Sequence, residues 1–286
     1  MRSRAVDEIG IEPVTGALGA EISGIDLSGD LPDSAITAIR QALLEHLVVF
    51  FRDQVLTPEQ LVRLGRRFGP LHIHPITKSM EGLPEVIEVI KEPEETGNWG
   101  DQWHTDLTAL AAPPLGSILY GKEIPPFSGD TQFLNMYLAY ETLSPTLRRF
   151  LDGLVCLHDQ DVEAYGEARF KAMHNMKDAS ASKALHPLVR THPETKRKSL
   201  FLSRPARTAV KDLTRQESET LLTFLDQHAS NPDFACRFRW RPNSIAFWDN
   251  RCTRHRVTAD YFYAQRGFPP HRRHMYRVTV EGDVPR

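Results

Sequence analysis

The chain has 286 residues, 41% of them hydrophobic, and a formal net charge of −2 at pH 7. This length suffices to bury a sizeable core, and the near-neutral charge gives no electrostatic basis for binding nucleic acid or an anionic membrane. Its three cysteines are widely spaced, which argues against a disulfide framework and for a reducing compartment. With no signal-peptide pattern, no linker and no apolar run of about 18 residues, we expect one cytoplasmic domain, residues 1–286.

The first part of the chain combines strand and helix patterns. Residues 9–27 alternate apolar and polar positions between glycines, which predicts short strands. Residues 33–46 have helical apolar spacing and begin with an aspartate that is expected to cap the helix, and residues 48–51 (VVFF) follow as a buried strand. A capping box with proline at the first helical position, residues 57–60 (TPEQ), predicts a second helix that ends near Phe68.

Strand patterns dominate the rest of the chain. Strands are predicted at 86–91, 116–124, 131–134, 186–192, 199–203, 236–240, 244–248 and 273–281. Helices are predicted at 137–143 and 145–153, and a second capping box (TRQE) begins a helix from 214 to about 228. Residues 159–184 are polar without a pattern and are expected to form a loop. Strands that do not alternate regularly with helices favour a mainly β fold, a double-sheet barrel with helices packed outside.

Residues 103–106 (WHTD) are the first candidate for chemistry. If this segment is extended, His104 and Asp106 project from the same face, because side chains alternate along a strand. His255, far along the chain at the end of the stretch WDNRCTRH, would complete a set of two histidines and one carboxylate. Such a set leaves coordination positions open and is typical of non-haem Fe(II) sites. A zinc site with a bound water stays open as an alternative.

Several motifs occur together and in one order over residues 9–285. They are LHIHP at 71–75, WHTD at 103–106, GDT at 129–131, HPLVRTHP at 186–193, WDNR at 248–251 and the tail 273–283. In this combination the chain resembles the taurine dioxygenase family of Fe(II)- and 2-oxoglutarate-dependent oxygenases. The resemblance implies a double-stranded β-helix, or jelly roll, and an enzyme that uses Fe(II), 2-oxoglutarate and O2.

The resemblance also implies residues for the cofactors. The two histidines and the aspartate would hold the iron, and Thr131 and Arg273 would bind the distal carboxylate of 2-oxoglutarate. A guanidinium is the usual partner for such a carboxylate in a pocket of low dielectric constant. On a strand, Arg273 and Arg277 would share a face. Residues 262–271 are an insertion relative to taurine dioxygenase, so Arg266 is the alternative partner for 2-oxoglutarate.

For the substrate, the resemblance places His74 and Arg277 at a small organic anion. Positions that contact taurine in the family are Thr77, Gly100 and Ala206 here, and each change removes bulk or a hydrogen bond. Hydrogen-bonding sites discriminate strongly, so we expect a larger, more apolar anion: a longer sulfonate, an alkyl sulfate ester or an aryloxyalkanoate. Hydroxylation would release succinate and CO2, and C–heteroatom cleavage would follow where the hydroxylated carbon bears a leaving group. The family also implies a homo-oligomer, a dimer or tetramer.

Two alternatives to hydroxylation stay open. The same iron site could catalyse desaturation or cyclisation in a biosynthetic pathway, which product analysis would separate from hydroxylation. A non-catalytic, cupin-like metal-binding protein would keep the ligands without turnover. Among the remaining polar and aromatic residues, Trp103 and Trp248 are expected to wall the site, His186 and His192 to be buried, and His158 to lie at the surface.

Overall fold

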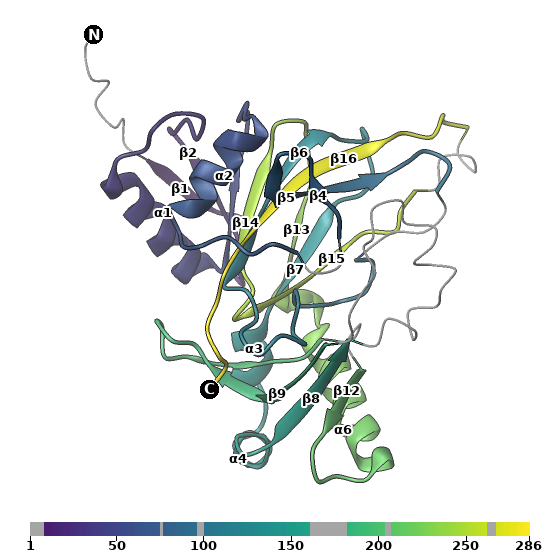
Figure 1. The fold of residues 1–286 in the computed structure, drawn as a ribbon. Helices are drawn as coiled ribbons and strands as arrows, with labels where there is room; N and C mark the ends of the chain where they lie inside the picture. Colours follow the sequence, from purple (N-terminus) through teal and green to yellow (C-terminus); the bar gives the residue numbers. More distant parts are fainter. Residues whose placement is uncertain (1–8, 75–76, 96–99, 161–181, 204–206, 262–266) are drawn as a thin grey trace.

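Two β-sheets that pack face to face form the centre of the protein (Figure 1). The computed structural model describes residues 9–74, 77–95, 100–160, 182–203, 207–261 and 267–286. In spatial order, the larger sheet contains β1 (Gly10–Pro13), β2 (Ala20–Ser23), β3 (Val48–Phe51), β14 (Ile245–Asp249), β6 (Gly116–Glu123), β16 (Arg273–Val280), β5 (Leu83–Lys91) and β4 (Ser79–Met80). The smaller sheet contains β13 (Ala235–Phe238), β7 (Thr131–Asn135) and β15 (Thr253–Val257). The predicted mainly β architecture with flanking helices is therefore confirmed.

Side-chain alternation gives the larger sheet two different apolar faces. On β14, Ile245 and Phe247 belong to the apolar cluster that includes the first two helices. Ala246 and Trp248 point the other way and pack with residues of the smaller sheet, such as Phe133. Every residue of β14 is buried because both of its faces are covered. The face between the sheets, called the inner face below, is the one that carries the candidate site.

Two helices near the N-terminus cover the outer face of the larger sheet (Figure 1). Helix α1 (Asp33–His46) has its predicted bounds, but the expected aspartate cap is wrong, because Pro32 occupies the N-cap position and no side chain caps the helix. Helix α2 (Pro58–Arg66) begins with the predicted capping box between Thr57 and Gln60. It ends slightly earlier than predicted, since Arg67 is already its C-cap.

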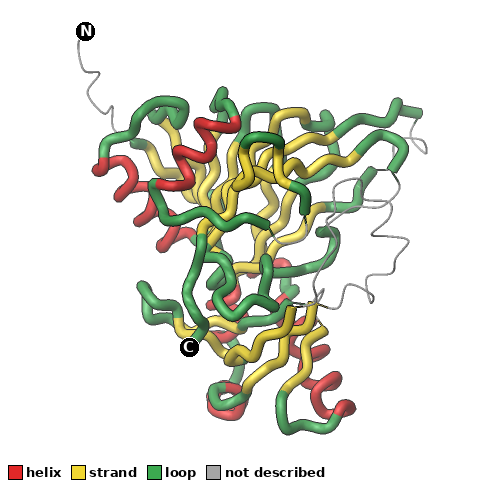
Figure 2. The backbone as a smooth tube through the Cα atoms, viewed as in Figure 1, coloured by secondary structure: helices red, strands yellow, loops and turns green. Residues whose placement is uncertain are grey.

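The other helices of the described residues gather with two small sheets at the opposite end of the molecule (Figure 2). The helices are α3 (Met136–Glu141), α4 (Pro145–Leu151), α6 (Arg215–Ala229) and the short 3-10 turn η2 (Pro232–Phe234). The small sheets are β12-β8-β9, made of β12 (Arg207–Val210), β8 (Val155–Gln160) and β9 (Ser182–Pro187), and the hairpin β10 (Val189–Thr191) with β11 (Lys198–Leu200). In the described part of the chain, every helix is too short to cross a bilayer.

Three predictions in this region need correction. The single strand expected at 186–192 is two strands, β9 and β10, separated at Leu188. The loop expected at 159–184 is shorter, because its first and last residues belong to β8 and β9, and 161–181 lie outside the described residues. Strands β8 and β12 in this region, like β15 in the smaller central sheet, were not predicted, because each contains several polar residues and pairs with strands that are distant in the sequence.

His158 on β8 is fully buried, so its expected surface location is wrong. Its ring lies 5.3 Å from that of His186 and 5.4 Å from that of Phe201, measured between centroids. Neither of its ring nitrogens has a hydrogen-bond partner among the described residues. Burial, with a smaller contribution from His186, lowers the pKa of His158 to about 3. The imidazole is therefore neutral in the folded protein down to acidic pH.

We expect His158 to make the protein less stable in mild acid. Above the ordinary histidine pKa of 6.5 the imidazole is neutral in both states. Below it only the unfolded chain takes up the proton, so the free energy of unfolding falls by about 1.4 kcal/mol per pH unit. Urea unfolding at pH 7.5 and 5.0 should show that the wild type loses about 2 kcal/mol more than His158→Leu. Equal losses in the two proteins would contradict this role.

Candidate metal and anion site

His104 and His255 are brought together by backbone pairing. The His104 N–H donates to the His255 carbonyl at 3.0 Å, and the His255 N–H donates to the His104 carbonyl at 2.8 Å. This bridge adds residue 104 to the edge of the smaller sheet, beside β15. The two imidazole rings lie with their centroids 4.2 Å apart. Residue 104 is thus extended as predicted, whereas Asp106 already lies in a turn.

Asp106 directs one carboxylate oxygen at both imidazoles. Its Oδ1 lies 3.7 Å from the Nε2 of His104 and 3.7 Å from the Nε2 of His255. The ligand atoms of the three residues lie within 4.8 Å of one another. Two nitrogens and one oxygen that face a common point are a donor set that a divalent metal can use. The three residues that the sequence predicted as ligands are therefore close together in the fold.

The protonation states of these side chains suit metal binding. The Nδ1 of His104 lies 2.8 Å from the Gln102 carbonyl, which can only accept, so Nδ1 carries the proton and the Nε2 lone pair faces Asp106. Burial lowers the pKa of both His104 and His255, which keeps them neutral. Burial alone would raise the pKa of Asp106, but Arg277 and the two histidines outweigh it and hold this pKa well below the usual range.

Strand β16 presents two arginines to the inner face. Arg273 and Arg277 lie two residues before and after Met275, which packs between the sheets, so all three share the inner face and the predicted common face is confirmed. The Nη1 of Arg277 lies 3.3 Å from Oδ1 of Asp106, and the Arg277 side chain is 12% exposed. A partly accessible guanidinium therefore touches the same oxygen that faces the two histidines. An anion held by Arg277 would lie beside the candidate metal position.

Arg273 lies deeper than Arg277, and its surroundings suit a carboxylate ligand. It is 6% exposed, and its Nε has no hydrogen-bond partner among the described residues. Burial lowers the pKa of Arg273, and Tyr261 and Asp130 oppose this shift. A Cβ at Gly129, which has a φ of +74°, would collide with Tyr261 and approach the Arg273 side chain. The positive φ and the contact with the Tyr261 hydroxyl therefore both favour glycine in this GDT turn.

Thr131 is buried at the start of β7, directly after that turn. Its hydroxyl oxygen accepts a hydrogen bond from the Trp240 indole N–H at 2.9 Å. Because this contact uses a lone pair, the hydroxyl proton remains available for an anion. The alternative partner for 2-oxoglutarate, Arg266, lies outside the described residues.

His74 is buried in the segment between α2 and β4. Its Nδ1 accepts the Thr77 backbone N–H at 2.9 Å, so in the neutral ring Nε2 carries the proton and can donate to an anion. Two residues earlier, the His72 N–H donates to the Thr279 carbonyl at 2.8 Å, which ties this segment to the strand that carries Arg277. Gly100, also expected near the substrate, packs against the His104 ring, whereas Ala206 lies outside the described residues.

A second cluster has metal-ligand residue types but is already occupied by internal contacts. It contains His192, Asp249 and Cys252, all buried. Both oxygens of Asp249 accept hydrogen bonds from Arg251, and the Nδ1 of His192 accepts two backbone N–H groups. Burial raises the pKa of the Cys252 thiol well above its usual value, so the thiolate that a metal needs is disfavoured. This cluster is a structural ion-pair network.

Two residues that contact Asp106 escaped sequence reasoning. Ser117 donates a hydrogen bond to Oδ2 of Asp106 at 2.9 Å, and the Asn250 amide lies 3.4 Å from the same oxygen. A serine in the strand-like run GSILY carries no chemical signal of its own. Only its spacing of two residues from the apolar Leu119, which puts both side chains on one face of the strand, could have placed it on the inner face. The expected aromatic wall is present at Trp248, whose ring lies 4.6 Å from that of His255, while Trp103 packs on the cluster around α3.

The candidate site combines two histidines and one carboxylate, with Arg273 and Arg277 presented by β16 of the larger sheet. Such a donor set is typical of non-haem Fe(II) oxygenases. The chain matches the family model "Taurine catabolism dioxygenase TauD, TfdA family" over residues 10–279, and it belongs to this family. It is thus a dioxygenase that uses Fe(II), 2-oxoglutarate and O2. The predicted family, enzyme class and cofactors are confirmed, and the non-catalytic alternative is not supported.

Individual relatives agree over nearly the whole chain. The alkylsulfatase of Acinetobacter baylyi is 32% identical over 97% of this chain and 86% of its own length. The (S)-phenoxypropionate/alpha-ketoglutarate-dioxygenase of Sphingobium herbicidovorans is 32% identical over 87% of this chain and 88% of its own. The crystal structure of a taurine dioxygenase from Burkholderia xenovorans superposes with a TM-score of 0.82 at 40% identity, covering 97% of this chain and 90% of that one.

Proposed function

We propose that His104, Asp106 and His255 are the iron ligands of this dioxygenase. The convergence of two imidazole nitrogens and one carboxylate oxygen supports this assignment. Three protein ligands on one side of the metal leave positions for a bidentate 2-oxo acid and for O2. When bound, the iron and 2-oxoglutarate supply the oxidising power, and the protein orients the C–H bond that is oxidised.

For 2-oxoglutarate, we assign the distal carboxylate to Arg273 and Thr131. A buried guanidinium with an unpartnered N–H is costly unless an anion completes its hydrogen bonds. The Thr131 hydroxyl adds a donor from the opposite sheet.

The substrate anion is assigned to Arg277 and His74. The observation that carries this proposal is the 3.3 Å contact between Arg277 and the Asp106 oxygen that faces the histidines. An anion held there would lie next to the metal, so the oxidised carbon would be close to the anionic group. The Nδ1 of His74 is occupied by the Thr77 N–H, so the Nε2 edge of the ring would face the same anion.

We propose a substrate larger and more apolar than taurine. Gly100 has no side chain to contact a substrate ammonium, and the Thr77 hydroxyl is buried without a partner among the described residues. Of the three relatives named above, one is called an alkylsulfatase and one an (S)-phenoxypropionate dioxygenase, whereas the crystal structure at 40% identity is that of a taurine dioxygenase. The proposed reaction is hydroxylation beside the anionic group, with release of succinate and CO2. Where that carbon carries an oxygen or sulfur leaving group, the product would collapse to a carbonyl compound.

We further infer that the two packed sheets are the double-stranded β-helix of this family. The antiparallel pairing of β14, β6, β16 and β5 in one sheet and of β13, β7 and β15 in the other supports it. A homo-oligomer and a single domain over residues 1–286 stay predictions, and chromatography with light scattering would measure the first.

Succinate formation from 2-oxoglutarate tests the proposed function directly. Purified enzyme with Fe(II) would be supplied with alkyl sulfates, alkanesulfonates and aryloxyalkanoates of increasing chain length, with taurine for comparison. We expect at least one apolar anion to stimulate succinate formation far more than taurine does, with a matching carbonyl product. Stimulation by taurine alone would contradict the proposed substrate class.

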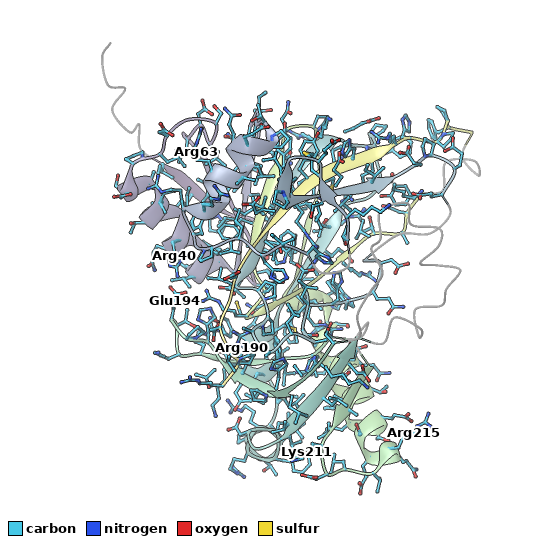
Figure 3. All side chains as sticks on the ribbon, in the orientation of Figure 1. Arg40, Arg63, Arg190, Glu194, Lys211 and Arg215 are labelled. Carbon is cyan, nitrogen blue, oxygen red and sulfur yellow. The ribbon has the colours of Figure 1, made fainter. Side chains whose placement is uncertain are left out.

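Replacing Arg277 with leucine should weaken substrate binding. A hydrogen bond to a charged group contributes about 1.5–3 kcal/mol, so the loss of this guanidinium should raise the KM for the best anion roughly 10- to 150-fold. Arg63→Leu on the exposed face of α2 removes the same group far from the site and serves as the control (Figure 3). An unchanged KM in Arg277→Leu would remove this arginine from the anion site.

A further inference from the structure

The second carboxylate oxygen of Asp106 has its own set of donors. Whereas Oδ1 faces the two histidines, Oδ2 accepts the Ser117 hydroxyl at 2.9 Å and lies 3.4 Å from the Asn250 amide nitrogen. The two oxygens thus have different surroundings: Oδ1 faces the candidate metal position, and Oδ2 faces the larger sheet. These contacts set the plane of the carboxylate.

Ser117 is held rigidly in the centre of the larger sheet. It is fully buried on β6 and pairs with Trp248 of β14 on one side and with Thr279 of β16 on the other. The Thr279 hydroxyl is 3.4 Å from that of Ser117. Because water does not reach this position, the Ser117 proton has few acceptors other than Asp106.

Asn250 is held by the turn that follows β14. Its Oδ1 accepts the Trp248 indole N–H at 3.0 Å, which orients the amide so that its nitrogen faces Asp106. On either side of it, Asp249 and Arg251 form a buried two-point ion pair. Arg251 also contacts Glu194, which in turn binds Arg40 of α1, as the neighbouring labels in Figure 3 show. The ion-pair network described above therefore fixes the turn that supplies Asn250.

We propose that Ser117, supported by Asn250, is a positioning residue that fixes Asp106 as a one-oxygen ligand. This inference rests on the assignment of Asp106 to the iron. A carboxylate that is free to turn can offer both oxygens to a metal and fill one further coordination position. Holding Oδ2 on Ser117 prevents this and keeps that position for 2-oxoglutarate or O2. Partners of this kind orient metal ligands and tune the metal.

The test compares Ser117→Ala with Thr279→Val, both in the full chain. Each variant removes one buried hydroxyl of the same pair, but only Ser117 contacts Asp106. Mn(II) affinity would be measured by calorimetry, and the visible spectrum of the Co(II)-loaded protein would report the ligand geometry. For Ser117→Ala we expect an affinity about 10- to 100-fold weaker and a changed Co(II) spectrum, with Thr279→Val like the wild type.

The outcomes separate this inference from the proposed function. If wild type and Ser117→Ala bind Mn(II) equally and share one Co(II) spectrum, Ser117 has no positioning role, although the iron assignment stands. If both hydroxyl variants change alike, the effect belongs to general packing, and the inference is overturned. If the wild type binds no divalent metal, the iron assignment fails together with it. Thermal unfolding of the metal-free variants checks that each retains the wild-type fold.

Discussion

Replacing Asp106 with alanine should abolish turnover and weaken Fe(II) binding by more than about 100-fold. Loss of a residue that only hydrogen-bonds a metal ligand costs up to about 100-fold, and loss of a ligand itself should cost more. Asp106 is the only negatively charged member of the proposed ligand set, and the neutral histidines cannot compensate the charge of a divalent cation. Its oxygen is also the point on which both imidazole nitrogens converge at 3.7 Å. Without it, Arg277 would remain as an uncompensated positive charge beside the metal position.

Calorimetric titration with Mn(II), and succinate formation in the presence of Fe(II), would measure this effect. Asp106→Asn is the matched variant, because it keeps the volume and one acceptor oxygen while removing the charge. We expect both variants to fold and both to lose high-affinity binding, with the asparagine variant the less affected. Retention of wild-type affinity in Asp106→Ala would exclude the carboxylate from the ligand set.

Replacing Arg273 with leucine should weaken 2-oxoglutarate binding roughly 100- to 1,000-fold, because two charge-assisted hydrogen bonds to one carboxylate are lost in a buried site. The effect should exceed that of an exposed ion pair, since water does not replace the lost donors at a position that is 6% exposed. Metal affinity should change little, because the charged groups that act on Arg273 among the described residues are Tyr261 and Asp130 and do not include the three ligand side chains.

The measurement is an anaerobic titration of the Fe(II)-loaded enzyme with 2-oxoglutarate, followed by the weak visible absorption of the chelate. Arg272→Leu is the control. Arg272 directly precedes β16, and its guanidinium pairs with Glu92 and Glu123. Arg272→Leu should titrate like the wild type. A normal titration of Arg273→Leu would instead transfer the role to another arginine, and Arg266 would be the next to replace.

Much of the fold could be read from local sequence. The capping boxes at Thr57 and Thr214 place the starts of α2 and α6 correctly, because a cap is satisfied by residues within the same turn. The bounds of α1 follow from its apolar period, although the assumed cap was wrong, because Pro32 ends the preceding segment without a side-chain acceptor. The continuous apolar run of β3 and the strand pattern of β16 were equally accessible.

The residues of the candidate site were predicted correctly, but the geometry expected for them was not. His104 and Asp106 were expected on one face of a strand, but only His104 is extended, and the chain turns at Asp106, where Leu107 adopts a φ of +50°. The side chains still converge, because the bridge to His255 and the contact with Ser117 hold them from two sheets. The motif identified the residues, and the tertiary contacts set their positions.

By itself, the sequence determined which residue types were available: the His-x-Asp pair with a distant histidine, two arginines on one strand face, and helices started by their own caps. These features depend on spacing along the chain and on hydrogen bonds within one turn, so they can be recognised without knowing which strands become neighbours. Only the tertiary structure decided that His158 is buried, that Ser117 and Asn250 reach Asp106, and that Arg277 touches the oxygen facing the histidines. Each depends on which strands become neighbours and in what register, and that is set by burial of the whole core.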